Sequence, residues 1–171
     1  AITADNILST RYSGKGFRYS AMLAVMYDTK HKGLFGHDLC GETIDYSVRY
    51  DPENPKHKFE DHHLIPKSST ASGSVPAIDS IANIVLLTRD KNGLIGNQSP
   101  RDYFDKLAKQ PNFDRLREEN LIDKDTFDLL LNEQYSDFLL ARATALAGYI
   151  NDYFQFDKER TEDLADNTDD E

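Results

Sequence analysis

The stretch Glu60-Asp61-His62-His63-Leu64-Ile65-Pro66 (EDHHLIP) decides the fold, because it places ionisable side chains on a short predicted strand. Three of the five histidines in the chain, His57, His62 and His63, lie within seven residues. Neighbouring side chains on a strand point to opposite faces, so His62 and His63 are expected to have different roles. Histidine ligates metals and titrates near neutral pH, so one can hold an ion while the other acts as general base. The alternative is a pair of surface histidines before a proline turn.

A second informative stretch, Asn83–Asn92 (NIVLLTRDKN), follows a small and polar segment over 67–76 that is typical of a surface loop. Its apolar run, Ile84–Leu87, is short enough for a buried strand. Residues 89–99 contain glycines and several amides, which favour a loop. Asparagine can bind a hard cation through its amide oxygen, but at the start of a strand it also fixes turns.

Hydrophobic periodicity predicts the other elements. The predicted strands are Glu42–Tyr50 and Phe59–Ile65, with a turn at 51–55 between them, and the predicted helices are Phe17–Lys32, Pro100–Lys109, Asp114–Glu119, Asp125–Glu133 and Gln134–Phe156. The last helix carries one broad, mainly apolar stripe: Phe138, Leu139, Ala141, Arg142, Ala145, Leu146, Tyr149, Ile150 and Tyr153. Ser99 and Pro100 form a capping signal, with serine at the N-cap and proline at the first helical position. Because strands come early and helices come late, the fold class is α+β.

Length and composition limit the class of protein. A chain of 171 residues suits one domain that folds without disulfides or a structural metal. Cys40 is the only cysteine, which excludes a disulfide framework within the chain and a zinc knuckle of paired cysteines. No apolar run approaches the ~18 residues that cross a membrane, and the N-terminus does not resemble a signal peptide. We expect a soluble, cytoplasmic protein without membrane contact, and the start at Ala1 indicates a piece of a longer protein.

The net charge of −10 is distributed unevenly. Residues 1–110 carry 14 Lys/Arg against 13 Asp/Glu, a net of +1, whereas residues 111–171 carry 6 against 17, a net of −11. The first part can therefore hold a local basic patch for a polyanion. Residues 157–171 carry eight acidic and two basic residues and lack apolar periodicity, so we expect an acidic disordered tail there.

Taken together, the two stretches resemble the signature of HNH nucleases. The shared pattern is a His-His-Leu-Ile-Pro strand, a polar loop, Asn-Ile-Val-Leu-Leu, and then Asp-Lys-Asn ending nine residues after Asn83. Residues 78–100 also resemble the HNH domain of CRISPR effector nucleases. The best overall similarity is to the C-terminal nuclease domain of GmrSD-type, modification-dependent restriction enzymes, over about residues 57–156. That family ends in helices with a Phe-x-x-x-Arg-x-x-x-Leu-Ala pattern, which Phe138, Arg142, Leu146 and Ala147 fit.

The resemblance implies a ββα-metal finger embedded in a mostly helical domain. The implied nuclease domain covers 1–156, with an N-terminal helix and strand over 1–56, the finger core over 57–110 and C-terminal helices over 111–156. His63 would be the general base, His62 and Asn92 the metal ligands, and Asn83 the residue that pins the loop. Asn97 is the alternative to Asn92 as the second metal ligand, or else a contact to phosphate. The other candidate contacts to phosphate or DNA are Lys67, Arg89, Lys91 and Arg101.

The implied function is metal-dependent hydrolysis of DNA phosphodiester bonds, within a larger restriction or anti-phage defence protein. The expected ion is Mg²⁺, with Mn²⁺, Ni²⁺ or Zn²⁺ as options for a mixed His/Asn site. An N-terminal sensor or NTPase-like domain of the same protein would complete it. The alternative is a catalytically degenerate HNH-fold module that binds nucleic acid, or a protein-interaction module with an acidic helical half.

Overall fold

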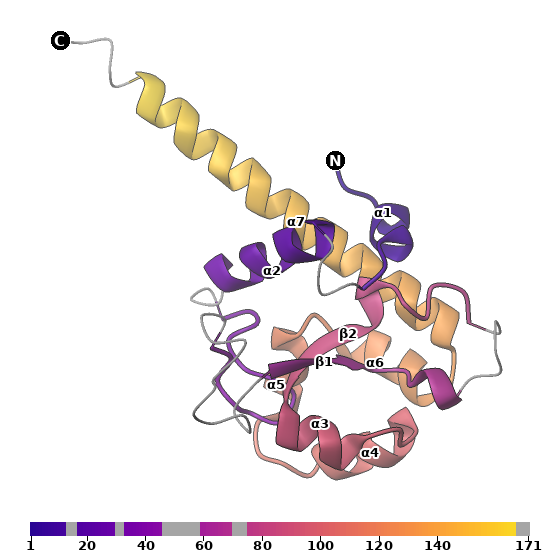
Figure 1. Ribbon diagram of the computed structural model, residues 1–171. Helices are drawn as coiled ribbons and strands as arrows, with labels where there is room; N and C mark the ends of the chain where they lie inside the picture. Colours follow the sequence, from indigo (N-terminus) through magenta and orange to yellow (C-terminus); the bar gives the residue numbers. More distant parts are fainter. Residues whose placement is uncertain (13–16, 30–32, 46–58, 70–74, 167–171) are drawn as a thin grey trace.

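The computed structural model describes residues 1–12, 17–29, 33–45, 59–69 and 75–166 (Figure 1). These ranges contain α-helices, short 3₁₀ turns and one two-stranded antiparallel sheet, which is compatible with the predicted α+β class. In chain order the elements are α1 (Ala4–Ser9), α2 (Phe17–Thr29), β1 (Phe59–His63), η3 (Lys67–Ser69), η4 (Ile81–Asn83), β2 (Ile84–Thr88), α3 (Arg89–Ile95), α4 (Pro100–Leu107), α5 (Phe113–Glu119), α6 (Lys124–Leu131) and α7 (Tyr135–Asp166).

The sheet joins the two stretches that the sequence singled out. β1 runs antiparallel to β2, with Phe59 opposite Thr88 and His63 opposite Ile84. β1 ends at His63, two residues before the predicted end. The N–H of Leu64 still donates to the carbonyl of Asn83, but the N–H of Asn83 binds the carbonyl of Ser80 and the N–H of Ile65 binds the Asn83 side chain, so the ladder does not continue. The predicted strands at both positions therefore exist.

Helix α3 occupies part of the segment, residues 89–99, that was expected to be a loop, so that prediction was wrong. The helix starts directly after β2, with Asp90 in its first turn, and Gly96 closes it by donating its N–H to the carbonyl of Asn92. α3 packs against both strands, and this tertiary contact stabilises a helix whose amide-rich sequence favours it only weakly. The order strand, strand, helix results.

Two further predictions fall partly outside the described residues. Of the predicted strand Glu42–Tyr50, residues 42–45 make only an isolated bridge between Thr43 and His37, and 46–50 are not described. The turn expected at 51–55 and His57 also lie outside the described part. Helix α2 ends at Thr29, and the predicted continuation over 30–32 is not described.

The long helix α7 crosses the molecule, and its C-terminal end projects beyond the other elements (Figure 1). α1, α2, α6 and η4 all pack against α7. Its buried face follows the predicted stripe, although Ala145 is exposed and Ala143 and Ala147 are buried instead. The apolar members of this face are Phe138, Leu139, Ala143, Leu146, Ala147 and Ile150, and Arg142 lies among them.

Helix α7 continues through Asp166, so the disorder expected from Asp157 onward is not found as far as that residue. The segment 157–166 contains no glycine or proline, and its Lys, Glu, Arg, Leu and Ala residues favour helix, which lets the helix extend from its packed part. Residues 167–171 are not described. The division of the chain at residue 156 remains a prediction.

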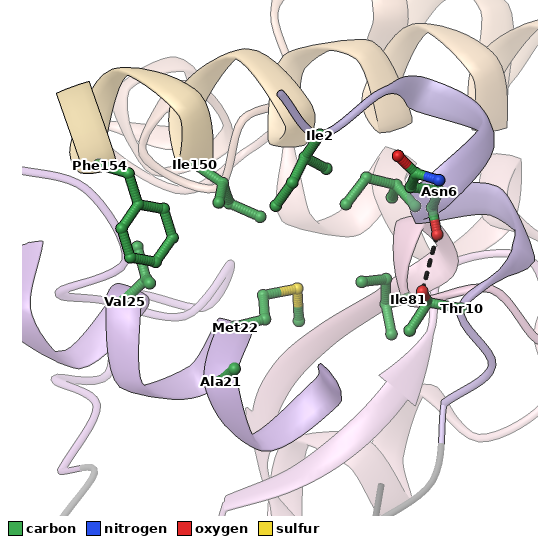
Figure 2. Close-up of a pocket in the computed structure, with 10 residues that line it drawn as sticks. Ile2, Asn6, Thr10, Ala21, Met22, Val25, Ile81, Ile150 and Phe154 are labelled. Carbon is green, nitrogen blue, oxygen red and sulfur yellow. Dashed lines mark hydrogen bonds between the residues drawn. The ribbon is translucent and has the colours of Figure 1, made fainter. Parts of the chain in front are cut away.

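The N-terminal helices pack on α7 around an apolar pocket of about 420 Å³ (Figure 2). Ile2 is held to α7 by paired hydrogen bonds, because its N–H donates to Asn151 Oδ1 and its carbonyl accepts from Asn151 Nδ2, both at 2.8 Å. Met22 of α2 and Ile81 of η4 contribute to the pocket wall. The pocket shares no lining residue with the hollow around the histidines described below.

The N-cap of α4 provides a test of local stability. Ser99 Oγ accepts from the N–H of Asp102, as the capping signal predicted. Replacing Ser99 by alanine should lower the free energy of unfolding by about 1 kcal/mol, because the hydroxyl's hydrogen bonds with the N–H and with Oδ2 of Asp102 are lost. Urea denaturation measures the change. Ser136→Ala, at an exposed serine in the first turn of α7, is the control and should stay within about 0.5 kcal/mol of wild type; equal effects would contradict the capping role.

Candidate functional site

The candidate site lies where β1, β2 and α3 meet. Residues of β1 and α3, with the segment after β1, line an open hollow of about 610 Å³. Six of the residues that the sequence predicted as functional line it: His62, His63, Lys67, Arg89, Asn92 and Asn97. Glu60 and Asp61 line it as well. The tertiary structure thus brings together side chains from two stretches that are separated in the sequence.

The closest contact in the hollow joins His62 and Asn92. His62 Nδ1 lies 2.8 Å from Asn92 Oδ1, although the residues are 30 positions apart. Asn92 Nδ2 donates to Glu60 Oε2 at 3.0 Å, which directs the amide oxygen toward the histidine. In this arrangement Nδ1 of His62 is the donor and Oδ1 of Asn92 the acceptor. A nitrogen and an oxygen are therefore held side by side at one point of the hollow.

The Glu60 carboxylate orders the other side of this contact. Its Oε1 accepts from Arg89 Nε at 2.8 Å, so one carboxylate binds both Arg89 and Asn92, from the first and second turns of α3. Glu60 and His62 are two residues apart on β1, so their side chains face the same side of the strand. This strand alternation was the sequence signal that could have identified Glu60 as part of the site.

His62 is nearly inaccessible, with 4% of its surface exposed. Burial lowers its pKa below the ordinary value, although the hydrogen bond to Asn92 opposes the shift. Its Nε2 is buried and has no hydrogen-bond partner among the described residues. The ring of Tyr103 stands edge-on to the imidazole at 5.8 Å between centroids. His62 is thus a rigidly held, neutral imidazole.

His63 is more accessible, with 19% of its side chain exposed. Its Nε2 lies 3.5 Å from Asp79 Oδ1, and the same carboxylate oxygen pairs with the Lys67 ammonium. Burial, and then the positive charge of Lys67, lower the pKa of His63, while Asp79 opposes the shift. Tyr12 packs edge-on against the ring at 5.8 Å. At neutral pH the imidazole is uncharged and able to accept a proton.

A third ionisable group of the hollow is Asp61, on the same strand as the two histidines. It is two residues before His63 on β1, so the two side chains lie on the same face. Burial raises the pKa of Asp61 to about 6, against the opposing hydrogen bond from Tyr12. Sequence analysis missed Tyr12 and Asp79, because neither residue belongs to the histidine and asparagine motifs that it selected.

Asn83 does not line the hollow but lies behind it, fully buried. Its Oδ1 accepts from the N–H of Ile65 at 2.9 Å, and its Nδ2 donates to the carbonyls of Ile65 and Ile78 at 3.0 and 2.9 Å. Its own carbonyl accepts from the N–H of Leu64. These bonds tie the chain immediately after His63 to the start of β2.

The remaining predicted contact residues are not part of the hollow. Arg101 donates to the carbonyl of Leu131 at the end of α6, and Lys91 does not line the hollow. Arg89 and Lys67 do line it, but each is paired with a carboxylate, Glu60 and Asp79 respectively. Both cations that line the hollow are therefore engaged by a carboxylate, and of these two carboxylates Glu60 lines the hollow as well.

Comparison of the chain with protein-family models, with curated proteins and with solved structures finds no match. Within the described ranges, no helix combines the length and the apolar character needed to traverse a bilayer. Nor do the described residues contain a group of three or more His, Cys, Asp or Glu side chains that could hold a metal ion.

The charges around His63 lead to opposite pKa shifts in two variants. In Lys67→Met the positive neighbour is lost and Asp79 remains, so the pKa of His63 should rise toward or above its ordinary value. In Asp79→Asn the carboxylate is lost and Lys67 remains, so the pKa should fall further. NMR titration of the imidazole C–H resonances measures both. A shift of the same sign in both variants would contradict the assignment.

Proposed function

We propose that this chain is a metal-dependent endonuclease domain of the HNH type that hydrolyses DNA phosphodiester bonds. The observation that carries the proposal is the 2.8 Å contact between His62 Nδ1 and Asn92 Oδ1, with His63 on the next position of the same strand. The resemblance to HNH nucleases assigns these three residues to one site. β1, β2 and α3 would then form the ββα-metal finger.

The donor pair is compatible with a divalent cation. Two adjacent ligands of an octahedral ion at about 2.1 Å would lie about 3 Å apart, close to the observed separation. Because the neutral imidazole can carry its proton on Nε2, Nδ1 can be freed for an ion. Two protein ligands leave most positions to water and phosphate oxygens, which suits Mg²⁺, while the nitrogen donor also suits Mn²⁺, Ni²⁺ or Zn²⁺. When bound, the ion supplies Lewis-acid stabilisation to the phosphate and to the leaving oxygen.

His63 would act as the general base. Its lowered pKa keeps the imidazole neutral at pH 7, so it can take a proton from a water molecule that attacks phosphorus in line with the departing 3′-oxygen. The negative charge of Asp79, 3.5 Å from Nε2, favours the imidazolium that results. The products would carry 5′-phosphate and 3′-hydroxyl ends.

The cations of the hollow would position the DNA backbone. Lys67 and Arg89 line the hollow together with the histidines and are paired with Asp79 and Glu60. Phosphate oxygens are charged, so they accept stronger hydrogen bonds from arginine and lysine than water does. Because this part of the chain is near neutral overall while the later helices are acidic, DNA would approach from the side of the hollow.

The similarity to GmrSD-type enzymes indicates the larger context. The domain would be the nuclease part of a restriction or anti-phage defence protein, and recognition of the DNA modification would belong to another domain of that protein. If the chain does not cleave DNA, that result would instead indicate a catalytically degenerate module with the same fold.

The role of His63 is tested by plasmid nicking. His63→Ala should lower the rate about 10²- to 10⁴-fold, because the water loses its proton acceptor. His37→Ala is the matched control, since His37 is a partly exposed histidine that pairs with Glu119 outside the hollow, and it should cut at the wild-type rate. Wild-type activity in His63→Ala would contradict the assignment, whereas inactivity of the wild-type chain with every divalent ion would favour the degenerate module.

The ligand assignment is tested by metal titration. EDTA should abolish nicking without lowering the melting temperature, because the apolar core does not depend on the ion. His62→Ala and Asn92→Ala should each raise the metal concentration for half-maximal rate, by about 10- to 100-fold. Asn97→Ala, at the rim of the same hollow, should leave it unchanged. A shift in Asn97→Ala with none in Asn92→Ala would transfer the ligand role to Asn97.

A further inference from the structure

Arg142 on α7 is a buried charge for which the described part of the chain supplies no counterion. Only 2% of its surface is exposed, and it is among the largest fully buried side chains. Among the described residues, no carboxylate lies within ion-pair distance of its guanidinium. A buried charge is unfavourable unless polar groups compensate it, so the partners of Arg142 indicate what it is for.

Main-chain carbonyls compensate this charge. Nη1 donates to the carbonyls of Ala82 at 2.5 Å and Ile84 at 2.9 Å, and Nη2 lies 3.5 Å from the carbonyl of Asn120. Burial lowers the pKa of Arg142 to about 9, which leaves the guanidinium charged at neutral pH. A charged donor binds carbonyls more strongly than a neutral one does.

The two closest carbonyls lie on either side of Asn83, which holds the chain after β1. Asn83 binds the N–H groups of Leu64 and Ile65 through its carbonyl and its Oδ1. Ile84, whose carbonyl Arg142 holds, is the residue opposite His63 in the sheet. Hydrogen bonds from α7 to the two neighbours of Asn83 in the chain, and from the end of β1 to Asn83 itself, therefore connect α7 to the segment that carries both histidines.

Tyr103 of α4 approaches the same point from another helix. Its hydroxyl donates to the carbonyl of Leu64 at 2.6 Å, and its ring stands against His62. Tyr103 is 1% exposed and, like Arg142, is held within the helical part of the core. The helical half thus contributes two buried polar side chains to the segment around the finger.

We infer that Arg142 is a positioning residue: by holding the carbonyls of Ala82 and Ile84, it sets the place of Asn83 and thereby of His62 and His63. The inference rests on the proposed function for its consequence in catalysis, but the positioning itself is a property of the fold. Arginine is needed because the planar guanidinium presents several donors in one plane, whereas lysine presents a single ammonium on a flexible stem.

The test compares two conservative substitutions by hydrogen exchange. In Arg142→Lys, the amides of Leu64 and Ile65 should exchange about tenfold faster or more relative to amides of α6, because their acceptor Asn83 is released. Arg117→Lys is the matched control: Arg117 is equally buried at 2% exposure, but it donates to the carbonyl of Ile122, away from the sheet. Unchanged exchange in Arg142→Lys, or an equal increase in both variants, would overturn the inference.

Kinetics then separate positioning from stability. Arg142→Lys should lower kcat for DNA nicking about 10- to 100-fold with KM within about twofold, because the histidines are displaced while the DNA-contacting surface is kept. Arg117→Lys should keep both constants. Faster exchange with unchanged kcat would overturn the link to the site. If the wild-type chain cuts no DNA but exchange still rises selectively in Arg142→Lys, the proposed function fails and the positioning of Asn83 stands.

A measurement on the wild-type chain covers the case in which Arg142→Lys does not fold. Native-state exchange at increasing denaturant should show Leu64 and Ile65 opening together with Ala143 and Leu146, the neighbours of Arg142 on α7. Opening of Leu64 and Ile65 at lower denaturant, while α7 remains protected, would overturn the inference.

Discussion

The side-chain amide of Asn83 and the main chain of Ile65 bind each other through two hydrogen bonds, and the arrangement of the site depends on this contact. The amide is fully buried, so each of its groups needs a partner, and a second donated bond to Ile78 completes the set. Since the N–H of Ile65 binds the Asn83 side chain and the N–H of Asn83 binds the carbonyl of Ser80, β1 stops at His63. The two histidines consequently stand at the end of a strand, next to a hollow.

Around this contact, charges are balanced in short and separate units. Glu60 binds Arg89 and Asn92, while Asp79 binds Lys67 and lies beside His63. The first unit orients Asn92, and the second lies against His63. In a partly dehydrated site such fixed partners hold side chains in one geometry more effectively than water does. Both histidines remain neutral, because burial outweighs the neighbouring acceptors.

The helices of the second half form the support of this site as well as the apolar core. α7 packs against η4, directly before β2, and Arg142 extends that contact with hydrogen bonds to the carbonyls beside Asn83. From α4, the hydroxyl of Tyr103 binds the carbonyl of Leu64, in the chain directly after β1. Because neither side chain lines the hollow, substitutions there would alter the site through geometry and leave its surface unchanged.

The sequence by itself determined the elements whose signals are local. The alternation and apolar runs of β1 and β2, the serine cap of α4 and the apolar stripe of α7 follow from neighbouring residues, and the structure contains each of them. The family resemblance also selected His62, His63 and Asn92 as one group, and these residues do line one hollow. Local patterns predict well where backbone propensity and burial favour the same element.

Tertiary structure decided the rest, because it depends on contacts between distant residues. The glycines and amides of residues 89–99 favour a loop locally, and packing on both strands makes residues 89–95 helix α3. Helix α7 likewise runs past the predicted end of its apolar stripe at Phe156. The pairing of Asp79 with Lys67 and His63, and the burial of Arg142 behind Asn83, left no periodic signal. The role of a buried polar group depends on its hydrogen-bond partners, and the folding of the whole chain determines which partners it has.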